Sequence, residues 1–125
     1  LIVISSVEGY ISLPYQAAYA ASKHGIIGLL DALRQELTQQ QAPVSVTAIL
    51  PAGIDTPFFE RAKNTMPNKP KPPAPVYSPE SVADAIVYAA EHPVRELTVG
   101  SGGRFMIGLR QKFPSISDAV FRKIG

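Results

Sequence analysis

The chain has 125 residues, which fits one domain, and 46% of them are hydrophobic, enough for a buried core. A net charge of +2 without a long basic run argues against a nucleic-acid partner, and the absence of cysteine excludes disulfides and thiolate zinc sites. The two histidines are far apart, and no apolar run reaches the roughly 20 residues of a membrane span. We therefore expect no metal site, no membrane span and a cytoplasmic protein.

The first half of the chain predicts a strand, a helix and a second strand. Residues 1–6 (LIVISS) form an apolar, β-branched run that is typical of a buried strand. A loop over residues 7–16 precedes a long helix over residues 17–40, whose apolar residues recur at helical spacing and in which Gly25 and Gly28 are expected to permit close packing. Residues 44–50 (VSVTAIL) predict the second strand. Two strands joined by a helix indicate a right-handed crossover and a parallel sheet.

The second half predicts a proline-rich loop, a helix, a strand and a tail. The sequence PAGIDTPFF follows the second strand directly, and residues 60–77 contain PNKPKPPAP, whose prolines disfavour regular hydrogen bonding. A serine, a proline and an acid at positions 78–80 are typical of a helix start. Residues 95–99 predict a third strand, the glycines at 100, 102 and 103 a turn, and the tail over residues 104–125 a short helix after its proline.

Three polar residues of the first half indicate chemistry. Tyr19 and Lys23 are four residues apart, so they lie one turn apart on the same face of the predicted helix. Ser6 ends the first strand, and strand alternation is expected to point Ser5 to the other face. A cation beside a phenol makes the phenol a usable acid or base, and the carboxyl edge of a parallel sheet is where α/β proteins build their sites.

A tyrosine–lysine pair at this spacing also occurs on many solvated helix faces, so the surrounding motifs decide. They are ISSVEG around Ser6, YAASK at residues 19–23, ALRQEL at residues 32–37 and PAGIDTPFF at residues 51–59. In order and spacing they resemble the C-terminal half of a short-chain dehydrogenase/reductase. The resemblance implies a Rossmann-like, three-layer α/β/α fold with a parallel sheet, of which residues 1–125 would be the C-terminal catalytic part and residues 60–77 the substrate loop.

The resemblance also implies a role for each residue. Tyr19 would be the general acid or base for a carbonyl or alcohol, Lys23 would hold the nicotinamide ribose, and Ser6 would stabilise the substrate oxygen. An ammonium at about 4 Å contributes roughly 4 kcal/mol at an effective dielectric of ~20, so we expect Lys23 to lower the pKa of Tyr19 by about three units. Pro51, Ile54 and Thr56 match the segment that contacts the cofactor, with Ala52 where the family usually has glycine.

The implied activity is an NAD(P)-dependent interconversion of a small alcohol and a carbonyl, with the full-length protein as a homo-oligomer. The N-terminal half that would bind the dinucleotide phosphates, and with it the choice between NAD and NADP, is expected upstream of Leu1. Two alternatives stay open: an NAD-dependent sugar-nucleotide epimerase or dehydratase, which shares the tyrosine–lysine spacing, and a truncated relative without catalysis.

Overall fold

The computed structural model describes residues 1–54 and 76–124, which form two β-sheets and several helices around them. In chain order the elements are β1 (Ile2–Ile4), the 3-10 helix η1 (Val7–Gly9), α1 (Ala17–Gln39), β2 (Thr47–Pro51), β3 (Gly53–Ile54), β4 (Val76–Tyr77), α3 (Pro79–Glu91), β5 (Glu96–Val99), α4 (Ser101–Lys112) and α5 (Pro114–Ile124).

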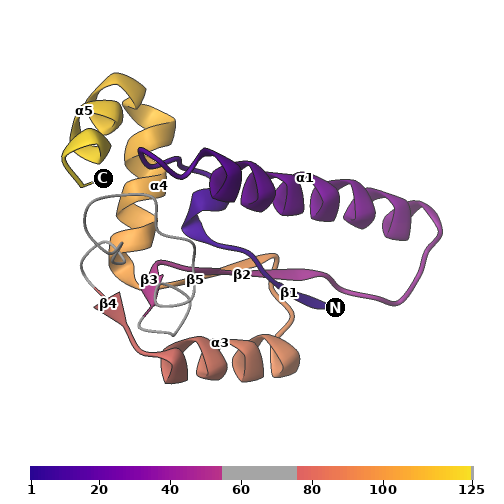
Figure 1. The fold of residues 1–125 in the computed structure, drawn as a ribbon. Helices are drawn as coiled ribbons and strands as arrows, with labels where there is room; N and C mark the ends of the chain where they lie inside the picture. Colours follow the sequence, from indigo (N-terminus) through magenta and orange to yellow (C-terminus); the bar gives the residue numbers. More distant parts are fainter. Residues whose placement is uncertain (55–75, 125) are drawn as a thin grey trace.

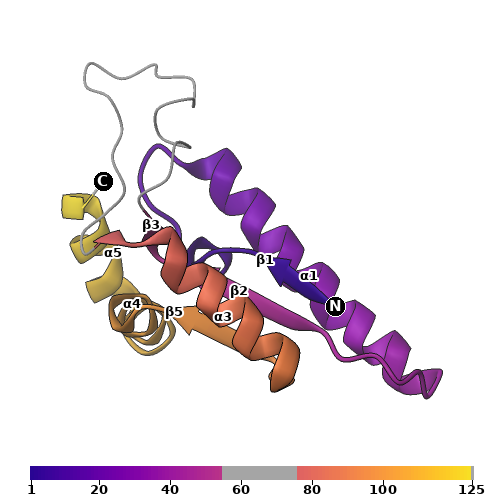
Figure 2. The same cartoon turned by 90° about the horizontal axis from the view of Figure 1, so that it is seen from below.

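The main sheet is parallel, with the strand order β1-β2-β5 and β2 in the centre. Helix α1 covers one face and α3 the other, as Figures 1 and 2 show from two directions. Strands β3 and β4 form a separate parallel pair. The predicted three-layer α/β/α architecture of the Rossmann type is therefore confirmed for the described residues.

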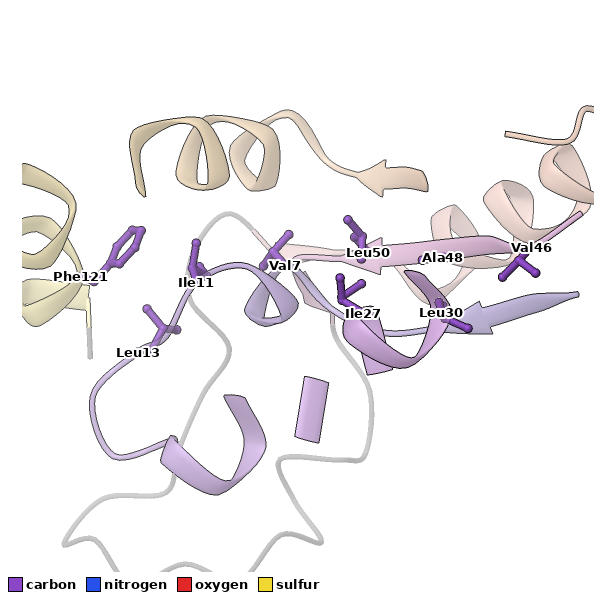
Figure 3. Close-up of a cluster of buried hydrophobic side chains, with 9 residues drawn as sticks. All are labelled: Val7, Ile11, Leu13, Ile27, Leu30, Val46, Ala48, Leu50 and Phe121. Carbon is purple, nitrogen blue, oxygen red and sulfur yellow. The ribbon is translucent and has the colours of Figure 1, made fainter. Parts of the chain in front are cut away.

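Strand β2 is buried along its whole length because both of its faces are covered. Ala48 and Leu50 belong to the apolar cluster under α1 that Figure 3 draws. Ile49, which points to the opposite face, packs in a second cluster with Ala89 of α3 and Val99 of β5. Full burial of one such large aliphatic side chain contributes about 1.5–3 kcal/mol. Because its residues belong to both clusters, β2 is the strand that joins the two layers.

The helix over residues 79–91 begins as the sequence predicts. Ser78 has extended backbone, and its Oγ accepts the backbone N–H of Ser81 at 3.3 Å, while Pro79 takes the first helical position. The cap gives a second acceptor to an N–H of the first turn, which also donates to the backbone oxygen of Ser78 at 3.1 Å. The long helix α1 and the strands β1, β2 and β5 also lie within a few residues of their predicted bounds.

The predicted turn over the glycines after β5 is wrong in part. Only Gly100 is in a turn, with φ of 103°, whereas Gly102 and Gly103 belong to the first turn of α4. A Cβ on Gly103 would lie 2.7 Å from Cγ1 of Val7 and 3.1 Å from Cγ2 of Thr98. Gly103 is therefore used for close packing of α4 against η1 and β5, and the tail is helical well before its proline.

Gly25 and Gly28 do not have the packing role that we expected. A Cβ built on either residue has no neighbour within 4 Å, and both are exposed on α1. The close approach to α1 is made instead by Gly9 of η1, where a Cβ would lie 2.8 Å from Cγ1 of Ile27 and 3.3 Å from the backbone oxygen of Lys23.

Residues 55–75 lie outside the described residues, and they include Thr56 and most of the predicted substrate loop. The last two residues of that loop form β4, which the sequence did not predict. Within the described part of the chain, no helix is long and apolar enough to cross a membrane.

Candidate active site

Ser6 lies where the chain leaves β1 and enters η1, and it caps that short helix. Its Oγ accepts the backbone N–H of Glu8 at 3.1 Å and donates to the backbone oxygen of Pro51 at 3.4 Å. The second bond joins the carboxyl ends of β1 and β2, and only 6% of Ser6 is exposed. The serine is therefore fixed at the edge of the sheet where the sequence analysis places the site.

Helix α1 brings Tyr19 and Lys23 to the same edge. Tyr19 lies in the first turn of α1, is half-buried, and forms a side-chain hydrogen bond with Ser6. The Nζ of Lys23 lies over the ring of Tyr19, 5.5 Å from its centroid. The structure thus brings together the three side chains that the sequence singles out.

The hydrogen bonds of Ser6 fit both protonation states of the phenol. A protonated Tyr19 can donate to Ser6, because the hydrogen of Ser6 goes to Pro51 and leaves its oxygen as an acceptor. After the phenol loses its proton, the Ser6 hydroxyl can rotate and donate to the phenolate. This second arrangement stabilises the charged form, which is why the bond with Ser6 lowers the pKa of Tyr19.

The pKa of Tyr19 nevertheless lies above its ordinary value, which contradicts our expectation. Burial of the phenol is the largest cause, and the negative charge of Glu8 adds to the rise. Lys23 is not among the causes, and its Nζ lies 5.5 Å from the centroid of the Tyr19 ring. In this arrangement Tyr19 is protonated at neutral pH.

Ser5 contributes to the site in a way that the sequence analysis missed. Its Oγ donates to the backbone oxygen of Lys23 at 3.2 Å, so it contacts the helix that carries the site and fixes the approach of α1 to β1. Alternation along the strand could not show this contact, since β1 ends at Ile4, before Ser5, and η1 begins at Val7.

Glu8 and Gln16 also escaped the sequence analysis, although Glu8 acts on the tyrosine through its charge and Gln16 bonds to Glu8. Glu8 is 7% exposed, and with the amide nitrogen turned toward it, Gln16 donates to its two carboxylate oxygens at 2.6 and 3.0 Å. Burial raises the pKa of the Glu8 carboxyl from 4.5 to about 7, against the opposing effect of a backbone hydrogen bond with Leu13.

The predicted cofactor segment begins beside Ser6. Pro51 is buried at the end of β2, and its backbone oxygen is the acceptor for Ser6. Ile54 belongs to β3, where it pairs with Tyr77, so its backbone lies just beyond the carboxyl end of β2. Thr56 lies outside the described residues, and its role stays a prediction. The described residues contain no group of acids and histidines that could hold a metal.

A parallel α/β fold brings a serine, a tyrosine and a lysine together at the carboxyl edge of its sheet, as the resemblance to short-chain dehydrogenases implies, and comparison with known proteins agrees on the family. The family model for short chain dehydrogenases matches residues 1–67. The uncharacterized oxidoreductase YxnA of Bacillus subtilis (strain 168) is 39% identical over 125 residues, which are 99% of this chain and 35% of that protein.

Two solved structures share the fold. A short chain dehydrogenase from Burkholderia cenocepacia J2315, in complex with NADP, superposes with a TM-score of 0.71 at 24% identity, over 96% of this chain and 46% of that one. A short chain dehydrogenase from Mycobacterium paratuberculosis, bound to NAD, has a TM-score of 0.57 at 23% identity, over 82% of this chain and 44% of that one.

The chain belongs to the short chain dehydrogenase family. It spans about a third of the length of YxnA and less than half of each of the two structures.

Proposed function

We propose that the intact protein is an NAD(P)-dependent oxidoreductase that interconverts a small alcohol and a carbonyl compound. The observation that carries the proposal is the hydrogen bond between Ser6 and Tyr19, with the ammonium of Lys23 over the same ring. Names of family members support it as well, since YxnA is called an oxidoreductase and the two solved relatives were determined with NADP and NAD.

The donors and acceptors of the site fit a nicotinamide cofactor. Lys23 offers up to three N–H donors one helical turn from the phenol, which suits the paired hydroxyls of a ribose. Pro51 and Ile54 supply backbone groups at the end of β2, and Thr56 would extend this segment. When bound there, the nicotinamide supplies or accepts the hydride.

Proton transfer is the step of the reaction in which residues of this chain take part. In the reducing direction Tyr19 gives its phenolic proton to the carbonyl oxygen, which becomes the alcohol hydroxyl. Ser6 donates to the same oxygen as negative charge develops on it. Tyr19 is protonated at neutral pH in this arrangement, so its phenolic proton is present for this step. Oxidation is the reverse and requires the phenolate.

Replacement of Tyr19 by phenylalanine tests the proposal. Tyr19→Phe removes the only atom of that side chain that can move a proton, so we expect turnover to fall by about 10²–10⁴-fold while the fold is kept. Tyr88→Phe is the matched control, because Tyr88 lies on α3, partly exposed, with its ring stacked on His92. Equal activity of the two variants would overturn the assignment.

Assays on the same protein preparation distinguish the proposed reaction from the two alternative functions. A sugar-nucleotide epimerase or dehydratase converts its substrate without net consumption of NADH or NADPH, whereas the proposed reaction consumes one reduced cofactor for each alcohol formed. A relative without catalysis would show no Tyr19-dependent turnover with any carbonyl compound. A cytoplasmic location and a homo-oligomeric state belong to the same proposal and await localisation and sedimentation experiments.

A further inference from the structure

A buried carboxyl group lies next to the catalytic tyrosine and is not needed for the reaction described above. Glu8 belongs to η1, directly after the serine, and is 7% exposed. Its backbone N–H donates to Oγ of Ser6, and its negative charge acts on Tyr19. Glu8 therefore bonds to Ser6 through its backbone and acts electrostatically on Tyr19 through its side chain.

Gln16 is the side chain that can satisfy this carboxyl in either protonation state. With its amide nitrogen toward Glu8, Gln16 donates to the ionised carboxylate, at 2.6 Å from Oε2 and 3.0 Å from Oε1. With its amide oxygen in the same place, Gln16 accepts a hydrogen bond from a protonated carboxyl. A rotation of the amide, without movement of the backbone, thus accommodates the gain or loss of one proton.

The described residues around Glu8 include no cation that pairs with its carboxylate. On α1 the titratable group that Glu8 acts on is Tyr19, and the Nζ of Lys23 lies over the ring of that tyrosine. Strand β2 has no titratable residue between Thr47 and Pro51. Helix α4 packs against η1 through Gly103, and its nearest charged residue, Arg104, is exposed. No cation among the described residues forms an ion pair with Glu8, and burial raises the pKa of its carboxyl to about 7.

We propose that Glu8, a buried carboxyl held by Gln16 beside the serine, is a positioning residue that gains and loses a proton and thereby sets the acidity of Tyr19. The step transfers one proton between solvent and the Glu8 carboxyl. With Glu8 ionised, the phenol is a weaker acid and stays protonated to higher pH; with Glu8 protonated, it ionises more readily. The consequence for turnover, a pH-dependent balance between reduction and oxidation, rests on the proposed function.

The first test observes the two groups directly and needs no turnover. In the intact protein labelled with ¹³C at the glutamate carboxyl and the tyrosine ζ carbon, the Glu8 signal should titrate with a midpoint near 7. The Tyr19 signal, assigned by its loss in Tyr19→Phe, should move with the same midpoint. A Glu8 midpoint near the ordinary value of about 4.3 would overturn the proposal.

Two variants show whether the coupling runs through Glu8. Glu8→Gln keeps a side chain that can bond to Gln16 but removes the proton, so the inflection of Tyr19 near neutral pH should vanish and its own pKa should fall. Glu36→Gln removes an exposed carboxyl from the same helix as Tyr19 and should leave the Tyr19 signal as it was. An unchanged Tyr19 titration in Glu8→Gln would contradict the proposal.

The pH profile of the reaction completes the test. In the oxidising direction the rate should rise with pH as Tyr19 loses its proton, and Glu8→Gln should shift that rise to lower pH, with the native profile kept in Glu36→Gln. Failure of the proposed function and failure of the role of Glu8 give different results. Full activity of Tyr19→Phe would overturn the proposed function and leave the ¹³C coupling intact, whereas an active enzyme without that coupling would overturn only the role of Glu8.

Discussion

Gly9 is the residue whose replacement tests most directly how η1 and α1 are held together. A Cβ at this position would lie 2.8 Å from Cγ1 of Ile27, 3.1 Å from Oγ of Ser5 and 3.3 Å from the backbone oxygen of Lys23. Carbon atoms pack best at about 3.5–4 Å, so the first contact is well inside the favourable range. The backbone oxygen cannot turn away as a side chain can, and η1 must therefore move.

We expect Gly9→Ala to lower the free energy of unfolding by about 1–3 kcal/mol, the usual cost of forcing an extra methyl group into a packed site. The backbone of Gly9 is not in the left-handed region, so the loss comes from packing alone. Because η1 carries the cap formed by Ser6, the same displacement should separate Ser6 from Tyr19 and reduce turnover at temperatures where the variant is still folded.

Urea unfolding followed by circular dichroism measures the effect, with the midpoint and the slope compared between variants. Gly25→Ala is the matched control, because the new Cβ meets nothing within 4 Å on the exposed face of α1. There alanine should raise the free energy of unfolding by roughly 0.5–1 kcal/mol, as it does at open helical positions. A Gly9→Ala midpoint at or above that of the native protein would refute the reasoning.

Two further predictions concern neighbours of the site. Ser5→Ala removes the donor to the backbone oxygen of Lys23 and should cost about 1 kcal/mol in urea unfolding, with Ser12→Ala, at an exposed position, close to neutral. Glu8 has a folded pKa raised from 4.5 to about 7, so the stability it contributes is complete below pH 4.5 and is lost as the pH rises through 7. After allowance for solvent screening, native stability should therefore fall by about 1–2 kcal/mol between pH 5 and pH 8 more than that of Glu8→Gln, and parallel curves for the two proteins would argue against a buried, proton-binding Glu8.

The sequence predicts those features that depend on local chemistry. Ser78 and Pro79 start α3 as their residue types require, and the spacing of Tyr19 and Lys23 places both on one face of α1. Residues 44–50 predicted β2 because they are mostly apolar and β-branched, and in the structure every residue of β2 is buried. Each of these patterns spans only a few residues, so the surrounding fold has little influence on it.

Other features depend on contacts between distant segments. Gly9 and Gly103 are identifiable as packing glycines only once α1 and α4 are placed against η1. The bond between Glu8 and Gln16 requires the loop between them to fold back, and sequence spacing does not show that. The pKa of Tyr19 was predicted in the wrong direction because the argument counted the charge of Lys23 and omitted the burial of the phenol.

The bond between Ser6 and Tyr19 is the contact on which the proposed chemistry depends, and titration of Tyr19 in Ser6→Ala tests it. A hydrogen bond to a charged group contributes about 1.5–3 kcal/mol, so its loss should raise the pKa of Tyr19 by about one to two units. The ¹³C signal of the Tyr19 ζ carbon measures this shift, with Ser12→Ala as the control for an exposed serine. A Tyr19 pKa in Ser6→Ala that equals or falls below the native value would contradict the account.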